Sequence, residues 1–159
     1  MLSAEARLSA GARISAEADF RVEFYDVDSM RVAWHGSYPR FFELGRCALL
    51  DKIGYGYDEM EASGYSWPVV DMRIKYLRPL LFKQRARVRA TLIDYENRIH
   101  LGFLIYDPAT REEFTKGSSV QMAIDMKKSE SLFACPECFL SLVRAALERA
   151  AEGRGEALP

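Results

Sequence analysis

Residues 24–38 read FYDVDSMRVAWHGSY, and this stretch decides the fold and carries the most chemistry. Asp28 precedes His35 by seven residues in it, where a strand pattern gives way to a helix pattern. A carboxylate there can act as a nucleophile or a base, and the free N–H groups at a helix N-terminus can hold a developing oxyanion. The stretch therefore favours acyl-transfer chemistry, with Asp28 and His35 as the candidate catalytic residues.

The segments on either side of this stretch predict a strand and a helix. From Phe20 to Phe24, hydrophobic and polar residues alternate as in a half-buried strand. Apolar residues at helical spacing then predict a helix over 38–53, which Gly54 stops. Gly45 lies on the apolar stripe of this helix. Because glycine costs a helix about 1 kcal/mol relative to alanine, we expect the helix to lie very close to another backbone.

The remainder of the chain predicts a meander of strands followed by a second helix. Alternating hydrophobic residues predict four strands over 70–77, 85–92, 99–105 and 120–124, and helical spacing predicts a closing helix over 136–151. The short connections between the strands favour antiparallel neighbours. The predicted fold class is α+β, an antiparallel five-stranded sheet wrapped around a long central helix.

Composition restricts the domain organisation and the partners. A chain of 159 residues, 49% of them hydrophobic, suits one domain. We place this domain at 19–152, after an extension of hexad repeats over 1–18 that we expect to be disordered or loosely helical, and before a tail at 153–159. The formal net charge of −1 argues against nucleic-acid partners and anionic membranes.

Cysteine content and hydropathy predict a compartment and argue against a metal site. The chain has three cysteines and no apolar run long enough for a signal sequence or a membrane span, which predicts a reduced, cytoplasmic protein. Cys135 and Cys138 form a C-x-x-C pattern, but no second pair of cysteines or histidines accompanies it. We expect an ordinary helix start there, and we predict neither a metal site nor a cofactor.

Several motifs resemble those of acyl-CoA thioesterases of the 4-hydroxybenzoyl-CoA thioesterase type, which have the hotdog fold. The resemblance runs from about Phe20 to Met126 and is carried by the combination of its motifs, because one short motif alone occurs by chance in many chains. The matching segments are Asp26-Val27-Asp28, Trp34-His35, Gly36-Ser37-Tyr38, the helix segment 40–46 with Glu43 and Arg46, Trp67-Pro68-Val69-Val70, and 74–79 with its closing Arg78-Pro79.

The resemblance implies hydrolysis of an acyl-CoA or acyl-carrier-protein thioester. It implies that Asp28 is the nucleophile or general base, that backbone N–H groups at or near His35 polarise the thioester carbonyl, and that the site lies between subunits of a homodimer or homotetramer. The residues expected to contact substrate, from the motifs or from their place nearby, are Arg31, Trp34, Tyr38, Glu43, Trp67, Val69 and Arg78.

One departure from the family pattern leaves alternatives open. Arg31 stands in the turn where many relatives have glycine, so the backbone there is expected to differ, and a cation near Asp28 would weaken that carboxylate as a base. Alternative functions are a non-catalytic acyl-CoA or carrier-protein binding module and an acyl-thioester dehydratase on the same fold. Arg73, Lys75, Arg85, Arg87 and Arg89 are either a solvated sheet face or a site for the CoA phosphates.

Overall fold

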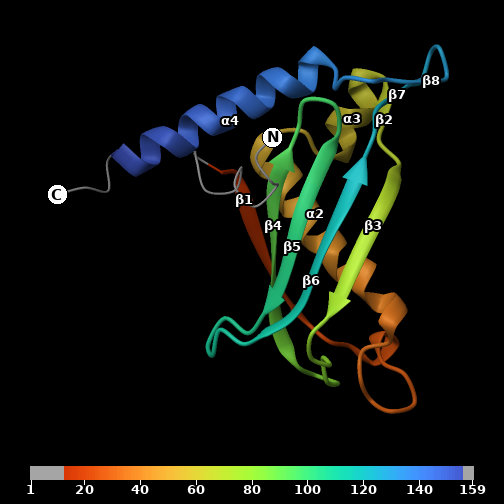
Figure 1. The fold of residues 1–159 in the computed structure, drawn as a ribbon, viewed down its shortest axis with the longest axis vertical. Coiled ribbons are helices and arrows are strands. Elements are labelled where there is room, and N and C mark those ends of the chain that lie inside the picture. The colour runs from red at the N-terminus through yellow and green to blue at the C-terminus, as the bar shows by residue number, and fades with distance from the viewer. Residues whose placement is uncertain (1–12, 156–159) are drawn as a thin grey trace, which may run out of the picture.

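A five-stranded antiparallel sheet forms the body of the molecule in the computed structural model, which describes residues 13–155 (Figure 1). Its strands lie in the order β1-β4-β5-β6-β3, so β1 and β3 are the edges. The bounds are β1 Ser15–Arg21, β3 Val69–Tyr76, β4 Arg85–Asp94, β5 Ile99–Tyr106 and β6 Glu113–Gln121. A smaller sheet joins β2 Tyr65–Ser66, β7 Ile124–Asp125 and β8 Glu130–Ser131. The predicted fold class is confirmed.

Helix α2, Tyr38–Ile53, has the bounds predicted for the central helix and packs against β1, β4 and β5. It ends at Gly54, whose φ of 87° is the left-handed conformation typical of a helix stop. A Cβ atom on Gly45 would lie 3.1 Å from a methyl group of Val88 and 3.3 Å from Cβ of Ala90. The expected close approach is therefore present, and it is to the small side chains of β4.

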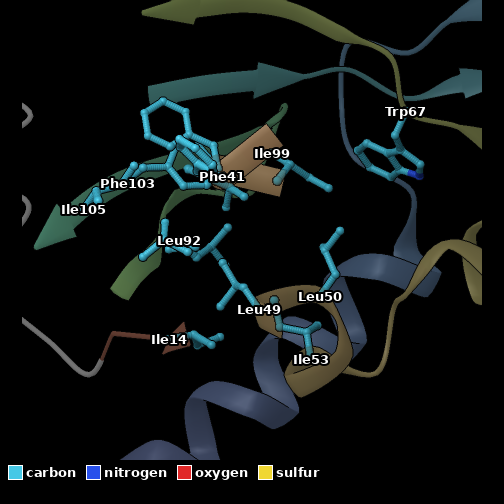
Figure 2. Close-up of a cluster of buried hydrophobic side chains, with 14 of the residues drawn as sticks. Ile14, Phe41, Leu49, Leu50, Ile53, Trp67, Leu92, Ile99, Phe103 and Ile105 are labelled. Carbon is cyan, nitrogen blue, oxygen red and sulfur yellow. The ribbon is translucent and has the colours of Figure 1, made fainter. Parts of the chain in front are cut away.

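The hydrophobic core lies between α2 and the sheet and continues under the last helix (Figure 2). Phe41, Leu49 and Leu50 of α2 are at most 1% exposed, as are Ile99 and Ile105 of β5. Helix α4, Glu137–Gly155, covers the end of α2 and begins one residue after the predicted start. Among the described helices, none has the length and apolar composition needed to cross a bilayer.

The first strand begins earlier than the sequence predicts. Residues 15–18 belong to β1 and not to a disordered or helical extension, whereas residues 1–12 lie outside the part of the chain that is described. Ala16 and Ala18 pack against the core, and Glu17 and Asp19 pair with arginines of β4. This alternation of alanine and acid is a strand pattern, but small residues make it hard to recognise.

The same strand also ends earlier than predicted, at Arg21 instead of Phe24. The short helix η1, Phe24–Asp26, follows it because the Asp26 carboxylate accepts a hydrogen bond from the Glu23 N–H at 2.8 Å and turns the chain. Phe24 is consequently 81% exposed. The predicted shared face of Phe20, Val22 and Phe24 is wrong for its last member.

Strand β6 lies mostly before the segment predicted for the last strand. Its inner face carries Gly117 and Ser119, which give no hydrophobic alternation. A Cβ atom on Gly117 would lie 2.5 Å from the ring of Phe42, so the small residue makes room for α2. The expected strand over 120–124 is divided between the end of β6 and the separate strand β7.

Candidate active site

The acidic loop after η1 is a narrow hairpin held against the segment that follows β3. Val27 and Ala33 form an antiparallel bridge, and Val32 forms another with Leu81. Arg31 has a φ of 63°, the left-handed conformation that glycine adopts most easily. The backbone at Arg31 is therefore in a conformation that glycine would favour.

The Asp28 carboxylate is half-buried in this hairpin, and only one of its two oxygens has a hydrogen-bond partner there. One of its oxygens accepts a hydrogen bond from the Met30 N–H at 2.8 Å, and within residues 13–155 no hydrogen bond reaches the other. The Arg31 guanidinium lies 5.1 Å from the ring centroid of Phe82. In the described part of the chain, no ion pair joins Arg31 to Asp28, and the effect of this cation on the carboxylate stays a prediction.

Asp26, the first acid of the motif, anchors the loop, as its structural interpretation predicts. Its side chain is 1% exposed and forms an ion pair with Arg40 of α2. Its backbone carbonyl accepts hydrogen bonds from the Trp34 N–H and the Ser37 hydroxyl, both at 2.8 Å. These contacts fix the loop to the first turn of α2. Arg40 is fourteen residues from Asp26, and no local pattern predicts that they pair.

The short helix η2, His35–Ser37, leads into α2 and presents free backbone donors. The first N–H groups of a helix have no partner inside it, and those of His35 and Gly36 donate no hydrogen bond elsewhere in the described chain. The Tyr76 hydroxyl donates to the His35 carbonyl at 2.6 Å. The Trp34 ring covers Gly36, where a Cβ atom would lie 2.3 Å from it. The turn is thus held from two sides.

A cavity of about 270 Å³, the loop cavity, opens beside this turn. Three residues predicted to form the site line it: His35, Tyr38 and Arg78. Tyr76 also lines it and was not a predicted site residue. Its other lining residues are Ala33, Leu77 and Pro79. Burial raises the pKa of Tyr38, which lines the cavity and is 2% exposed. Asp28 does not line this cavity and lies in the adjoining hairpin.

A second cavity lies at the far end of α2, beside helix α3, Tyr57–Ser63. This α3 cavity has a volume of about 450 Å³ and a mainly apolar lining that includes Trp67. Its full lining is Tyr57, Met60, Glu61, Gly64, Tyr65, Ser66, Trp67 and Met126. At 1.5 Å per residue, α2 separates its two ends by about 24 Å. One chain therefore does not bring Trp67 and Val69 to the Asp28 loop.

The remaining candidate residues divide between the surface and the helix. Arg31 and Trp34 are exposed at the loop, and Arg78 pairs with Glu112 at 2.7 Å. Glu43 lies on α2 and contacts Arg46 and Tyr57, a tyrosine that the sequence analysis did not single out. Val69 is 42% exposed at the start of the edge strand β3.

Two cations of the outer sheet face, Arg87 and Arg89, are paired with acids of β1. Arg87 contacts Asp19 at 2.5 Å, and Arg89 contacts Glu17 at 2.7 Å. The Arg87 guanidinium lowers the pKa of the Asp19 carboxyl through its hydrogen bond. These pairs favour a solvated ionic face for Arg87 and Arg89 over a site for CoA phosphates.

Comparison with known proteins is consistent with this arrangement. The sequence pattern of the thioesterase-like superfamily matches residues 22–151. YneP of Bacillus subtilis (strain 168), which carries the name of an acyl-CoA thioesterase, is 32% identical over 111 residues, 69% of this chain and 80% of YneP. A chloroplastic acyl-acyl carrier protein thioesterase of Arabidopsis thaliana, ATL3, is 25% identical over 70% of this chain and 59% of its own.

A solved structure shows the same fold. The DHNA-CoA thioesterase of Staphylococcus aureus superposes with a TM-score of 0.74 and 20% identity, over 91% of this chain and 96% of that one. The family pattern and the identity to YneP establish the relationship, and the superposition establishes the fold. The chain therefore belongs to the thioesterase-like superfamily and is a thioester hydrolase with the hotdog fold.

Proposed function

We propose that the protein hydrolyses acyl-CoA thioesters, with Asp28 as the catalytic carboxylate and the N–H groups of the His35 turn as the oxyanion donors. The observation that carries the proposal is the oxygen of Asp28 that accepts no hydrogen bond in the described chain. The hairpin that holds it is fixed to the start of a helix, and the N–H groups of His35 and Gly36 there also have no acceptor in the described chain. A thioester carbonyl held by these N–H groups has its developing negative charge stabilised.

Two routes complete the hydrolysis. In one, Asp28 attacks the carbonyl carbon, the C–S bond breaks to release the CoA thiolate, and water hydrolyses the resulting mixed anhydride. In the other, Asp28 takes a proton from water, and the water oxygen attacks the carbonyl carbon directly. The thiolate is a good leaving group in both routes, so the site needs no strong general acid.

The proposed site forms between two copies of the chain. Strand β3 is an edge strand of eight residues, and much of it is exposed. A long exposed edge invites pairing with another chain. Antiparallel pairing of two β3 strands about a twofold axis places the Tyr76 end of one against the Val69 end of the other. The Asp28 loop of one copy then faces the α3 cavity of its partner.

The acyl group is expected to occupy that α3 cavity. Its lining by Met60, Tyr65 and Trp67 is apolar and suits a hydrocarbon or aromatic acyl group. The resemblance to ATL3, whose name is that of a carrier-protein thioesterase, supports acyl-carrier-protein thioesters as the second candidate substrate class. The cytoplasmic location stays a prediction.

A thiol-release assay over acyl-CoA and acyl-carrier-protein thioesters tests the proposed function. We expect saturable release of free thiol, with an equal amount of carboxylic acid, from at least one apolar acyl thioester. Binding without thiol release from any of them would instead favour the non-catalytic binding module.

Removing the Tyr76 hydroxyl is expected to slow catalysis without weakening substrate binding. Tyr76→Phe keeps the ring but frees the His35 carbonyl, so the peptide that carries the oxyanion donor loses its orientation. A lost hydrogen bond of this kind costs about 1.4 kcal/mol, which corresponds to a roughly tenfold lower kcat with KM nearly unchanged. Steady-state kinetics on the best substrate measure both constants.

Tyr106→Phe is the matched control. It also removes a tyrosine hydroxyl, one that donates to Glu17 at 2.9 Å and accepts from Arg89 at 3.2 Å on the outer face of the sheet. We expect it to leave kcat unchanged. If both variants lose the same activity, Tyr76 has no special role in positioning the turn.

A further inference from the structure

Arg46 of α2 is a buried arginine whose contacts fix a neighbouring carboxylate. It is 3% exposed, and its terminal N–H groups donate to Glu43 at 2.5 Å and to the Ser119 hydroxyl at 2.7 Å. Its guanidinium carbon lies 5.8 Å from the ring centroid of Phe103. A buried cation is costly unless it is paired. Glu43 is therefore held in one place by a charge that has no access to water.

Glu43 in turn holds the ring of Tyr57. Its other oxygen accepts a hydrogen bond from the Tyr57 hydroxyl, at the first residue of α3. Burial, together with this hydrogen bond to Glu43, raises the pKa of Tyr57 to about 12. The hydroxyl consequently remains a donor at neutral pH. Arg46, Glu43 and Tyr57 form a chain of contacts that leads from the core to the wall of the α3 cavity.

Tyr57 separates the α3 cavity from a neighbouring cavity of a different character. The neighbour, the acidic cavity, has a volume of about 340 Å³ and includes Asp51, Asp58 and Glu59 in its lining. Tyr57 is the one residue common to the linings of these two cavities in the described chain. Tyr57, which is 47% exposed, therefore borders both an apolar space and a space lined in part by carboxylates.

We propose that Tyr57 is the closed end of the acyl pocket and sets the length of the acyl chain that the pocket accepts. This rests on the proposed function, because it takes the α3 cavity as the acyl site. A chain that reaches Tyr57 meets a ring whose hydroxyl is bonded to Glu43, which Arg46 holds in place. Beyond the ring it would meet the carboxylates of the acidic cavity, where further methylene groups gain little.

The test measures binding separately from turnover. S-alkyl-CoA thioethers from butyl to hexadecyl have no scissile acyl group, and calorimetry gives their affinities for the full-length protein. For the wild type we expect the binding affinity to rise about fourfold for each methylene buried. The affinity should then reach a plateau and stay constant once the alkyl chain is long enough to reach Tyr57. In Tyr57→Ala we expect the plateau to begin at least two methylenes later, so the longest ligands bind roughly tenfold tighter than to the wild type.

Two further variants make the result specific. Tyr57→Phe keeps the ring but not its bond to Glu43, so long-chain affinities are expected to fall between those of the wild type and Tyr57→Ala. Tyr65→Ala removes a tyrosine that lines only the α3 cavity, and it should weaken all chain lengths while leaving the plateau position unchanged. Circular dichroism checks that each variant is folded.

The outcomes separate this proposal from the proposed function. If the wild type binds the thioethers and releases thiol, but Tyr57→Ala has its plateau at the same length as the wild type, Tyr57 does not set acyl length. If the wild type neither binds the thioethers nor hydrolyses any thioester, the proposed function itself is wrong, and the assignment of Tyr57 fails with it.

Discussion

Asp28→Asn is expected to lower kcat about a thousandfold, within the range that loss of a positioned base or nucleophile produces. The amide oxygen of asparagine can still accept the Met30 N–H, so the hairpin should keep its shape. What is lost is the negative charge that attacks the carbonyl or takes the proton from water. Thiol-release kinetics give the rate, and thermal unfolding shows whether the fold is retained.

Asp26→Asn is the informative comparison for that experiment. Asp26 is buried and paired with Arg40, so its change removes a charge from an anchor of the loop. We expect Asp26→Asn to lower the melting temperature and Asp28→Asn to leave it nearly unchanged. An Asp28→Asn enzyme with wild-type kcat would remove Asp28 from the catalytic role.

Met72→Asp is expected to yield a folded monomer that has lost at least about 99% of the activity, because a composite site cannot form without the partner. Met72 lies near the centre of β3, where the twofold axis of the proposed dimer would bring the two copies of the strand together. In the proposed dimer, two carboxylates would then approach each other in place of two side chains that pack against the core. Light scattering measures the mass, and thiol release measures the activity.

The same charge placed elsewhere on the sheet serves as the control. Thr91 is half-buried on β4, away from the β3 edge. Thr91→Asp should therefore remain associated and active. A fully active monomer of Met72→Asp would show that one chain contains the entire site.

Regular patterns made much of the fold predictable. Helix α2 has its predicted bounds because its apolar stripe, Pro39 and Gly54 all agree on one structure. The inner faces of β4 and β5 alternate cleanly, as in Val88 and Leu101, and are buried as expected. The start of β6 was not predicted because Gly117 leaves space for Phe42 and interrupts the hydrophobic alternation, and the sequence of the strand does not reveal that contact.

The candidate site was only partly predictable, for a related reason. Asp28 and His35 occur together in one motif, whereas Tyr76 is forty-one residues from the His35 carbonyl that it contacts. Tyr57 likewise reaches Glu43, fourteen residues earlier, only because the chain turns back after α2. Such pairs depend on tertiary structure. The separation of Trp67 from the Asp28 loop is also a property of the folded chain, and the composite site is proposed on that ground.

Hybrid dimers test the composite site most directly. Asp28→Asn removes the carboxylate, and Ser66→Trp is designed to fill the α3 cavity, so each variant alone should have little activity. When the two are unfolded together and refolded in equal amounts, half of the dimers are hybrids with one intact site. We predict recovery of about a quarter of the wild-type activity. A mixture no more active than its separate components would contradict a site built from two chains.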